Sequence, residues 1–182
     1  MKYTEKVMTL VERTVTAGKE IHKQIRELKE SHRAEKIATA DFKQKLQELE
    51  TMRRNICMDA TQQLQVIGNE YRAAANKSSE IDSSMIHEDA KLLQLGMKMS
   101  AHQFETLVEK HRENPLMAQL LQEYSEKHEG LYTGFIPTAE GKIKAFDSFI
   151  GAAQNTIREP DSLQSAFFQS GRYTPNYCTE SE

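Results

Sequence analysis

Two long amphipathic patterns, separated by only a few residues, constrain the fold of this chain more than any other feature. In the second pattern, apolar side chains recur mostly three, four or seven positions apart, as on one face of an α-helix; they are Phe42, Leu46, Leu49, Ile56, Ala60, Leu64, Ile67, Tyr71 and Ala74. The connection "IATAD" (37–41) offers Thr39 or Asp41 as an N-cap. So short a connection requires the two helices to run antiparallel. At 1.5 Å per residue, the sequence predicts a helical hairpin roughly 50 Å long.

The first pattern, over residues 3–36, is an imperfect heptad repeat. Val7, Thr14, Ile21 and Leu28 occupy one seam position, and Val11, Gly18 and Ile25 occupy the other. Thr14 and Gly18 weaken the repeat, because coiled-coil seams are normally apolar throughout. We therefore expect a coiled-coil-like helix, and self-association through this seam stays open.

The polar stretch "NKSSEIDSS" (76–84) is rich in turn-forming residues and marks the best internal boundary. Beyond it, the patterns are shorter: 85–95 should be a helix that ends at Gly96, and Thr138 should start another that ends before Pro160. The sequence thus predicts an all-α fold with a long antiparallel hairpin followed by a small helical bundle. We assign 1–76 to the hairpin, 77–84 to a linker, 85–158 to a compact helical module and 159–182 to an irregular tail.

Residues 100–128 predict two short helices on either side of a tight break, which is also the outline of a DNA-reading helix-turn-helix. Ser100 and Gln103 form a capping box, and Asn114 caps a second helix that Pro115 begins. A recognition helix should present basic or amide side chains to the bases, but the outward positions of the second helix are expected to be Met117, Gln119, Gln122, Glu123 and Glu126. An acidic surface repels a duplex, so we interpret this pair as a packing hairpin.

The sequence contains no recognisable catalytic, cofactor-binding or metal-binding motif. A zincin-type HExxH motif is absent, because "HEDAK" at His87 has no second histidine one turn later, and His102 and His111 are nine positions apart. We therefore expect solvated or helix-capping histidines and no metal. Cys57 and Cys178 form no CxxC pair, and no phosphate-binding glycine motif occurs. We expect no cofactor and no enzymatic activity.

Composition and charge limit the cellular environments and the kinds of partner that suit this chain. It has 182 residues, of which 38% are hydrophobic and 28% charged. No apolar run approaches the roughly 20 residues that span a bilayer, and the cysteine pattern favours a reducing cytoplasm. The net charge of −3 is uneven: residues 1–36 sum to +3, residues 37–80 to 0 and residues 81–182 to −6. A basic N-terminal part and an acidic C-terminal part indicate two surfaces with different partners.

The best candidate contact surface is a row of cations on the first predicted helix. At 100° per residue, four side chains fall on the side away from Ile21, Ile25 and Leu28; they are Lys19, Lys23, Arg26 and Arg33, hereafter the basic row. Such a row can follow a nucleic-acid backbone. Glutamates border it and no aromatic residues alternate with it for base stacking, so a solvated helix face is the favoured alternative.

Two stretches carry a family resemblance: "DAKLLQLGMKMSAHQFETLVEKHRENPLMAQLLQEYSEKH" and "AFFQSGRYTPNYC". With the length of the chain, they resemble small phage- or prophage-encoded proteins of gut Firmicutes, in particular type II-A anti-CRISPR proteins. The resemblance implies stoichiometric inhibition of the type II CRISPR effector nuclease bound to guide RNA, in the cytoplasm of the bacterial host. The quoted motifs are caps and core residues, so they identify no contact residues.

Two routes of inhibition follow from physical reasoning. Either the acidic C-terminal part imitates DNA, or the long hairpin wedges between lobes of the nuclease and traps an inactive state. We favour the second route, because −6 spread over residues 81–182 is dilute for a nucleic-acid mimic. A phage scaffold protein and a nucleic-acid-binding accessory protein remain the alternatives.

Overall fold

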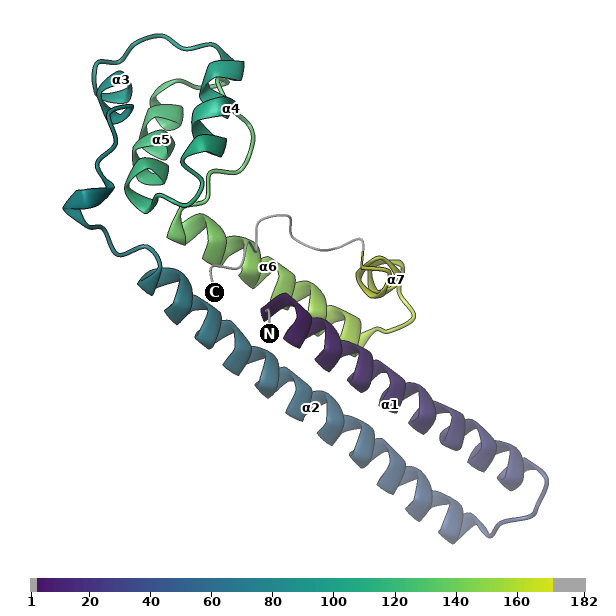
Figure 1. The fold of residues 1–182 in the computed structure, drawn as a ribbon. Coiled ribbons are helices and arrows are strands. Elements are labelled where there is room, and N and C mark those ends of the chain that lie inside the picture. The colour runs from purple at the N-terminus through teal and green to yellow at the C-terminus, as the bar shows by residue number, and fades with distance from the viewer. Residues whose placement is uncertain (1–2, 172–182) are drawn as a thin grey trace. The chain divides into compact units, whose positions relative to one another are not determined.

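The computed structural model describes residues 3–171, and this part of the chain is helical and contains no strand (Figure 1). Two long helices come first, α1 (Tyr3–Arg33) and α2 (Thr39–Lys77), followed by a short 3-10 turn, η1 (Ser83–Met85). The later helices are α3 (Ala90–Gln94), α4 (Ala101–Lys110), α5 (Pro115–Lys127), α6 (Ala139–Arg158) and α7 (Leu163–Gln169). None of these helices combines the length and apolar composition needed to cross a bilayer.

The chain divides into two compact units, with boundaries after Asn69 in α2 and before Ser148 in α6. The first unit contains residues 3–69 and 148–171 of the described chain, and the second contains residues 70–147. Each unit has its own buried side chains and is described separately.

In the first unit, α1 and α2 form the predicted antiparallel hairpin (Figure 1). Arg13 donates a hydrogen bond to Gln63 at 3.3 Å, and the guanidinium of Arg53 lies 2.6 Å from Nε2 of His22. Near the tip of the hairpin, the rings of His32 and Phe42 stack with centroids 4.3 Å apart. In these three contacts, residues 13, 22 and 32 of α1 meet residues 63, 53 and 42 of α2, respectively. The two helices therefore run antiparallel.

A Schellman motif ends α1 and turns the chain toward α2. The N–H of Lys36 donates to the carbonyl of Ser31 at 3.0 Å, and the N–H of Glu35 donates to that of His32 at 3.0 Å. Glu35 has φ of +57°, the left-handed conformation that this motif needs. Helix α2 begins at Thr39, so the expected N-caps Thr39 and Asp41 lie inside the helix, and its first bond runs from the N–H of Phe42 to the carbonyl of Ala38 at 2.9 Å.

The core of the first unit lies where α6 and α7 accompany the hairpin. Val7 and Leu64 are fully buried, and the rings of Phe149 in α6 and Phe168 in α7 are 5.1 Å apart. The predicted heptad seam contributes Val7, Val11 and Ile21 to this core, and the predicted stripe of α2 contributes Ala60 and Leu64. The buried hydrophobic residues of the first unit are Val7, Leu10, Val11, Val15, Ile21, Ala60, Leu64, Phe149, Ile150, Ala153, Ile157 and Phe168.

The second unit has a separate core, built mainly by α3, α4 and α5. Phe104 and Met117 are fully buried at its centre, and the hydroxyl of Tyr124 donates to the carbonyl of Met97 at 2.5 Å. The two capping predictions are confirmed: Ser100 and Gln103 form the capping box of α4, and the side chain of Asn114 accepts from the N–H of Met117 at the start of α5. The buried cluster comprises Ala90, Leu93, Phe104, Val108, Met117, Ala118, Leu121, Tyr124 and Ile136.

Three local expectations differ from the structure. The helix expected over 85–95 is only five residues long, Ala90–Gln94, because the N–H of Asp89 bonds the imidazole of His87 and not a helical carbonyl. Met117 was expected to face outward and is fully buried, since the apolar face of α5 centres on Met117, Ala118 and Leu121. Within 159–182, residues 163–169 form α7, which Ser162 caps; Cys178 and the residues after 171 lie outside the described chain.

Candidate functional site

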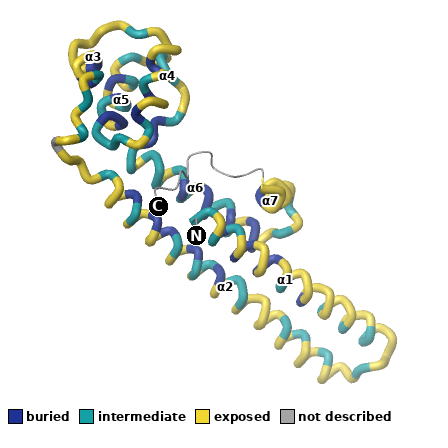
Figure 2. Tube along the Cα trace, in the orientation of Figure 1, coloured by how far each residue is buried: buried dark blue, intermediate teal, exposed yellow. Residues whose placement is uncertain are grey.

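The outer part of the hairpin, residues 22–59, contains no buried residue (Figure 2). We call this segment the distal hairpin. Its apolar seam residues Ile25, Leu46 and Ile56 are only partly covered, and the side chains of Met52 and Met58 are 51% and 64% exposed. The predicted stripe therefore continues into a region where its side chains are only partly covered, and it leaves apolar surface available to a partner.

A groove of about 1190 Å³ lies in the first unit, against α1, α2 and the end of α6. Ile25, Ile56 and Met58 give it apolar walls. Four cations, Lys29, Arg53, Arg54 and Arg158, line it together with two carboxylates, Glu50 and Asp59. The groove thus combines apolar surface with an excess of positive charge, which suits a partner that carries phosphates or carboxylates.

The structure places all four members of the basic row on exposed positions of α1. None of them lines the groove. The groove-lining positions of α1 are Thr14, Val15, Gly18, His22, Ile25 and Lys29, and three of these immediately precede Lys19, Lys23 and Arg26. One residue corresponds to 100° around the helix, so the basic row flanks the groove. The groove cations of α2 were not singled out from the sequence, although Arg53–Arg54 is a visible basic pair.

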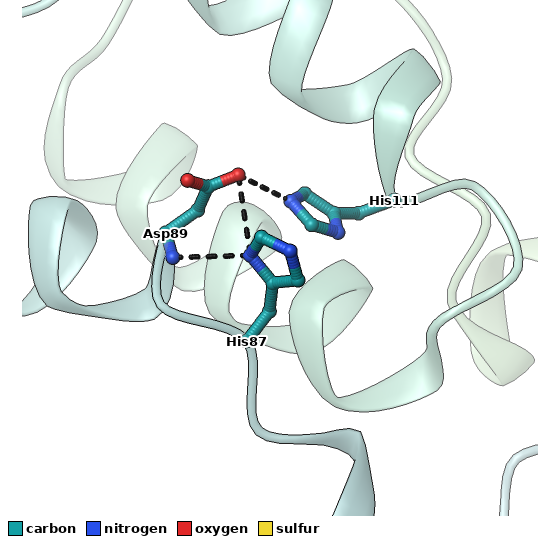
Figure 3. Close-up of side chains that lie close together, drawn as sticks. All are labelled: His87, Asp89 and His111. Atoms are coloured by element: carbon teal, nitrogen blue, oxygen red, sulfur yellow. Dashed lines mark hydrogen bonds and ion pairs between the residues drawn. The ribbon is translucent and has the colours of Figure 1, made fainter.

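A second candidate site lies in the second unit, where His87, Asp89 and His111 converge (Figure 3). Oδ2 of Asp89 is 2.8 Å from Nε2 of His111 and 3.3 Å from Nδ1 of His87. The imidazole of His111 is 4% exposed, whereas that of His87 is 42% exposed. The ammonium of Lys110 also donates to Oδ2 of Asp89 at 2.7 Å.

Local backbone structure brings these side chains together. His111 is the C-cap residue of α4, and the turn that follows reaches Asn114 at the start of α5. The amide of Asn114 also donates to the carbonyl of Met85 at 2.7 Å, which fastens the segment carrying His87 to that turn. Asp89 immediately precedes α3. Asn114 thus caps α5 and also links the segment that carries His87 to the turn that follows His111.

Electrostatics at this site favour an ionised carboxylate. Hydrogen bonds from Lys110 and then from His111 lower the pKa of Asp89 to about 2, while burial opposes them. An ionised carboxylate beside two imidazoles is a common set of ligands for a divalent transition metal.

Sequence reasoning did not find this cluster, because its members are not at a helical metal-binding spacing. Helix capping is confirmed for His111 and His128, which are the C-caps of α4 and α5, and His22 and His102 are exposed. The only local signal was the His-x-Asp spacing of His87 and Asp89. Its third member is 22 residues beyond Asp89 and is brought close only by the fold.

Comparisons with protein-family models, with curated proteins and with solved structures give no match to this chain.

Proposed function

We propose that this chain is a non-catalytic inhibitor that binds the type II CRISPR effector nuclease, together with its guide RNA, through the distal hairpin. The observation that carries the proposal is the absence of buried residues over 22–59, beside a row and a groove rich in cations. A segment with exposed apolar residues and clustered positive charge has the composition of a binding surface. The resemblance of residues 89–128 and 166–178 to type II-A anti-CRISPR proteins supports the choice of partner.

Binding alone is enough for inhibition. The nuclease must rearrange before it cleaves, so a ligand that prefers one inactive arrangement lowers the population of the active one. In this proposal, the apolar side chains of the distal hairpin contact protein, and the basic row contacts phosphates of guide RNA or target DNA. The inhibitor acts in the cytoplasm of the bacterial host, where the nuclease works.

A target-cleavage assay with purified nuclease, guide RNA and this protein tests the proposal. We expect cleavage to stop near a stoichiometric amount of inhibitor. Replacing Lys19, Lys23, Arg26 and Arg33 by glutamine should raise the half-inhibitory concentration about tenfold, since each exposed phosphate contact contributes a modest electrostatic attraction. Uninhibited cleavage by several type II orthologues at a large molar excess of the protein would refute the proposal.

A matched control removes charge elsewhere. Four exposed cations of the second unit are Lys77, Lys91, Lys98 and Lys127. Their replacement by glutamine should leave inhibition within about twofold of the unmodified protein. If this control weakens inhibition as much as the basic-row variant does, net charge and not the basic row determines binding.

A phage scaffold protein is the second candidate, and one observation favours it. The heptad seam extends past Ile21 to Ile25 and Leu28, which are only partly covered in the single chain. Another copy could cover them, as in a coiled coil. Sedimentation of the protein alone should then show assembly that increases with concentration. A monomer at high concentration would exclude this candidate and leave the inhibitor proposal intact.

A further inference from the structure

We propose that His87, Asp89 and His111 form a binding site for a zinc-type divalent metal ion, with Nδ1 of His87, Oδ2 of Asp89 and Nε2 of His111 as ligands. One ligand atom from each of the three residues lies within 4.8 Å of those from the other two. The site belongs to the second unit and is independent of the nuclease-binding surface proposed above.

The spacing of the ligand atoms suits zinc. Two ligands at about 2.0–2.1 Å from a tetrahedral ion are roughly 3.3 Å apart. The distance from Nδ1 of His87 to Oδ2 of Asp89 is 3.3 Å, and the distance from Nε2 of His111 to the same oxygen is 2.8 Å. Metal binding displaces the proton with which Nε2 of His111 bonds this oxygen, leaving the ring proton on Nδ1. Opening the second distance by a few tenths of an ångström then completes three corners of the coordination shell. The exposed edge of His87 leaves the fourth corner to water.

The hydrogen bonds of His87 provide a second argument. The backbone N–H of Asp89 donates to Nδ1 of His87 at 3.1 Å, so this nitrogen carries a lone pair and the ring proton is on Nε2. The same Nδ1 faces the carboxylate oxygen of Asp89 at 3.3 Å. Two acceptor atoms then face each other without a proton between them, an arrangement that repels. A cation bound to both atoms removes this repulsion, and its bond to Nδ1 replaces the hydrogen bond from the N–H of Asp89, because Nδ1 has one lone pair.

Lys110 is the natural competitor for this site. Its ammonium lies 2.7 Å from the oxygen that we assign to the metal, and its side chain is 52% exposed. Metal binding therefore requires the ammonium to leave Oδ2, which its exposed and flexible stem permits. Lys110 balances the charge of Asp89 in the absence of metal and opposes a second cation in its presence.

The metal would act as a cross-link. His87 belongs to the segment between η1 and α3, and His111 ends α4, so one ion ties two segments that are 24 residues apart in the chain. Binding that occurs only in the folded state stabilises that state according to the concentration and affinity of the metal. The fold of the second unit is thereby coupled to metal availability.

Titration of the full-length protein with Co²⁺ and Zn²⁺ alone tests this site. We expect one Co²⁺ per chain, with visible absorption typical of four-coordinate cobalt, displaced by Zn²⁺, and a rise in melting temperature with either ion. His87→Ala should reduce affinity at least about tenfold, and this substitution at an exposed side chain should leave the helical circular dichroism unchanged. His111→Ala removes a buried ring, so His87→Ala remains informative if that variant fails to fold.

Two further variants separate a metal site from a simple ion-pair cluster. Lys110→Ala should tighten Co²⁺ binding roughly three- to tenfold, because it removes the competing charge. His102→Ala, at an exposed position in the first turn of α4, should leave binding unchanged. The proposal fails if the unmodified protein shows no site-specific binding, if His87→Ala binds as well as the parent, or if Lys110→Ala weakens binding.

Discussion

The distal hairpin and the helices α3, α4 and α5 are both helical, but different interactions stabilise them. Residues 22–59 form long helices without a single buried residue, and they depend on backbone hydrogen bonds and on one pairwise contact surface. Helices α3 to α5 are 5, 10 and 13 residues long, too short to be stable alone in water. Side-chain caps and the buried cluster around Phe104 hold them in place.

This contrast separates a stable module from a surface that is available for binding. The short helices have most of their apolar side chains covered within the second unit, so their residues primarily determine folding. The distal hairpin leaves partly covered apolar residues and exposed methionines, so its residues should affect binding more than folding. The predictions below test how the two regions differ in stability and, for the exposed methionines, in binding. They are given in decreasing order of the expected effect on stability.

Removing a phenyl ring should have very different consequences in the two regions. Phe104 is fully buried, so Phe104→Ala should lower the free energy of unfolding of the second unit by about 3–5 kcal/mol. Phe42 in the distal hairpin is only partly covered and stacks on His32, so Phe42→Ala should cost about 1 kcal/mol. Urea denaturation, with amide exchange in α4 and α5, measures both. Equal losses would contradict the contrast.

Replacing Asn114 should have the next largest effect on stability. Its side-chain oxygen accepts from the N–H of Met117, and its side-chain amide donates to the carbonyl of Met85. Asn114→Ala removes the cap of α5 and the bond to the carbonyl of Met85, and should destabilise the second unit by about 1–2 kcal/mol. Asn114→Asp keeps the capping oxygen and loses the donor, so it should cost less than alanine. If aspartate proves as harmful as alanine, the bond to Met85 and not the cap stabilises the unit.

A reciprocal pair of substitutions compares the turn of the hairpin with the turn after α3. Glu35 and Gly96 both have positive φ, +57° and +62°. Glu35→Gly should stabilise the hairpin by roughly 0.5–1 kcal/mol, and Gly96→Ala should destabilise the second unit by a similar amount, because a Cβ strains this conformation. Thermal melts and amide exchange at each turn measure the changes. A destabilising Glu35→Gly would show that the glutamate side chain stabilises the turn in some other way.

The features predictable from the sequence are those that depend on local periodicity and on caps. The stripe through Leu64 and Tyr71 predicted the long second helix. Ser100, Gln103 and Asn114 predicted where α4 and α5 begin, because such signals act within one or two turns of chain. The buried state of Met117 was missed for a related reason. Helix α5 has apolar residues on adjacent positions, and only the packed core decides which of them point inward.

The groove and the cluster of His87, Asp89 and His111 were harder to predict, since each depends on contacts between distant segments. The basic row could be named because it lies on one helix. The groove combines Lys29, Arg53 and Arg158, which come from three different helices, and no single periodicity relates them. The same holds for His111 and Asp89, whose contact requires the α4–α5 turn to approach the residues before α3.

The smallest effect on stability is expected for exposed methionines, and here the two regions should differ in binding alone. Met58 in the distal hairpin and Met97 in the second unit are 64% and 52% exposed. Met58→Gln and Met97→Gln should each change the free energy of unfolding by less than about 0.5 kcal/mol, as surface substitutions usually do. In the cleavage assay, Met58→Gln should weaken inhibition several-fold because it places a polar group on the proposed contact surface, whereas Met97→Gln should not. If Met97→Gln weakens inhibition and Met58→Gln does not, the contact surface lies in the second unit, and the partly covered seam of the distal hairpin requires another occupant, most directly a second copy of the chain.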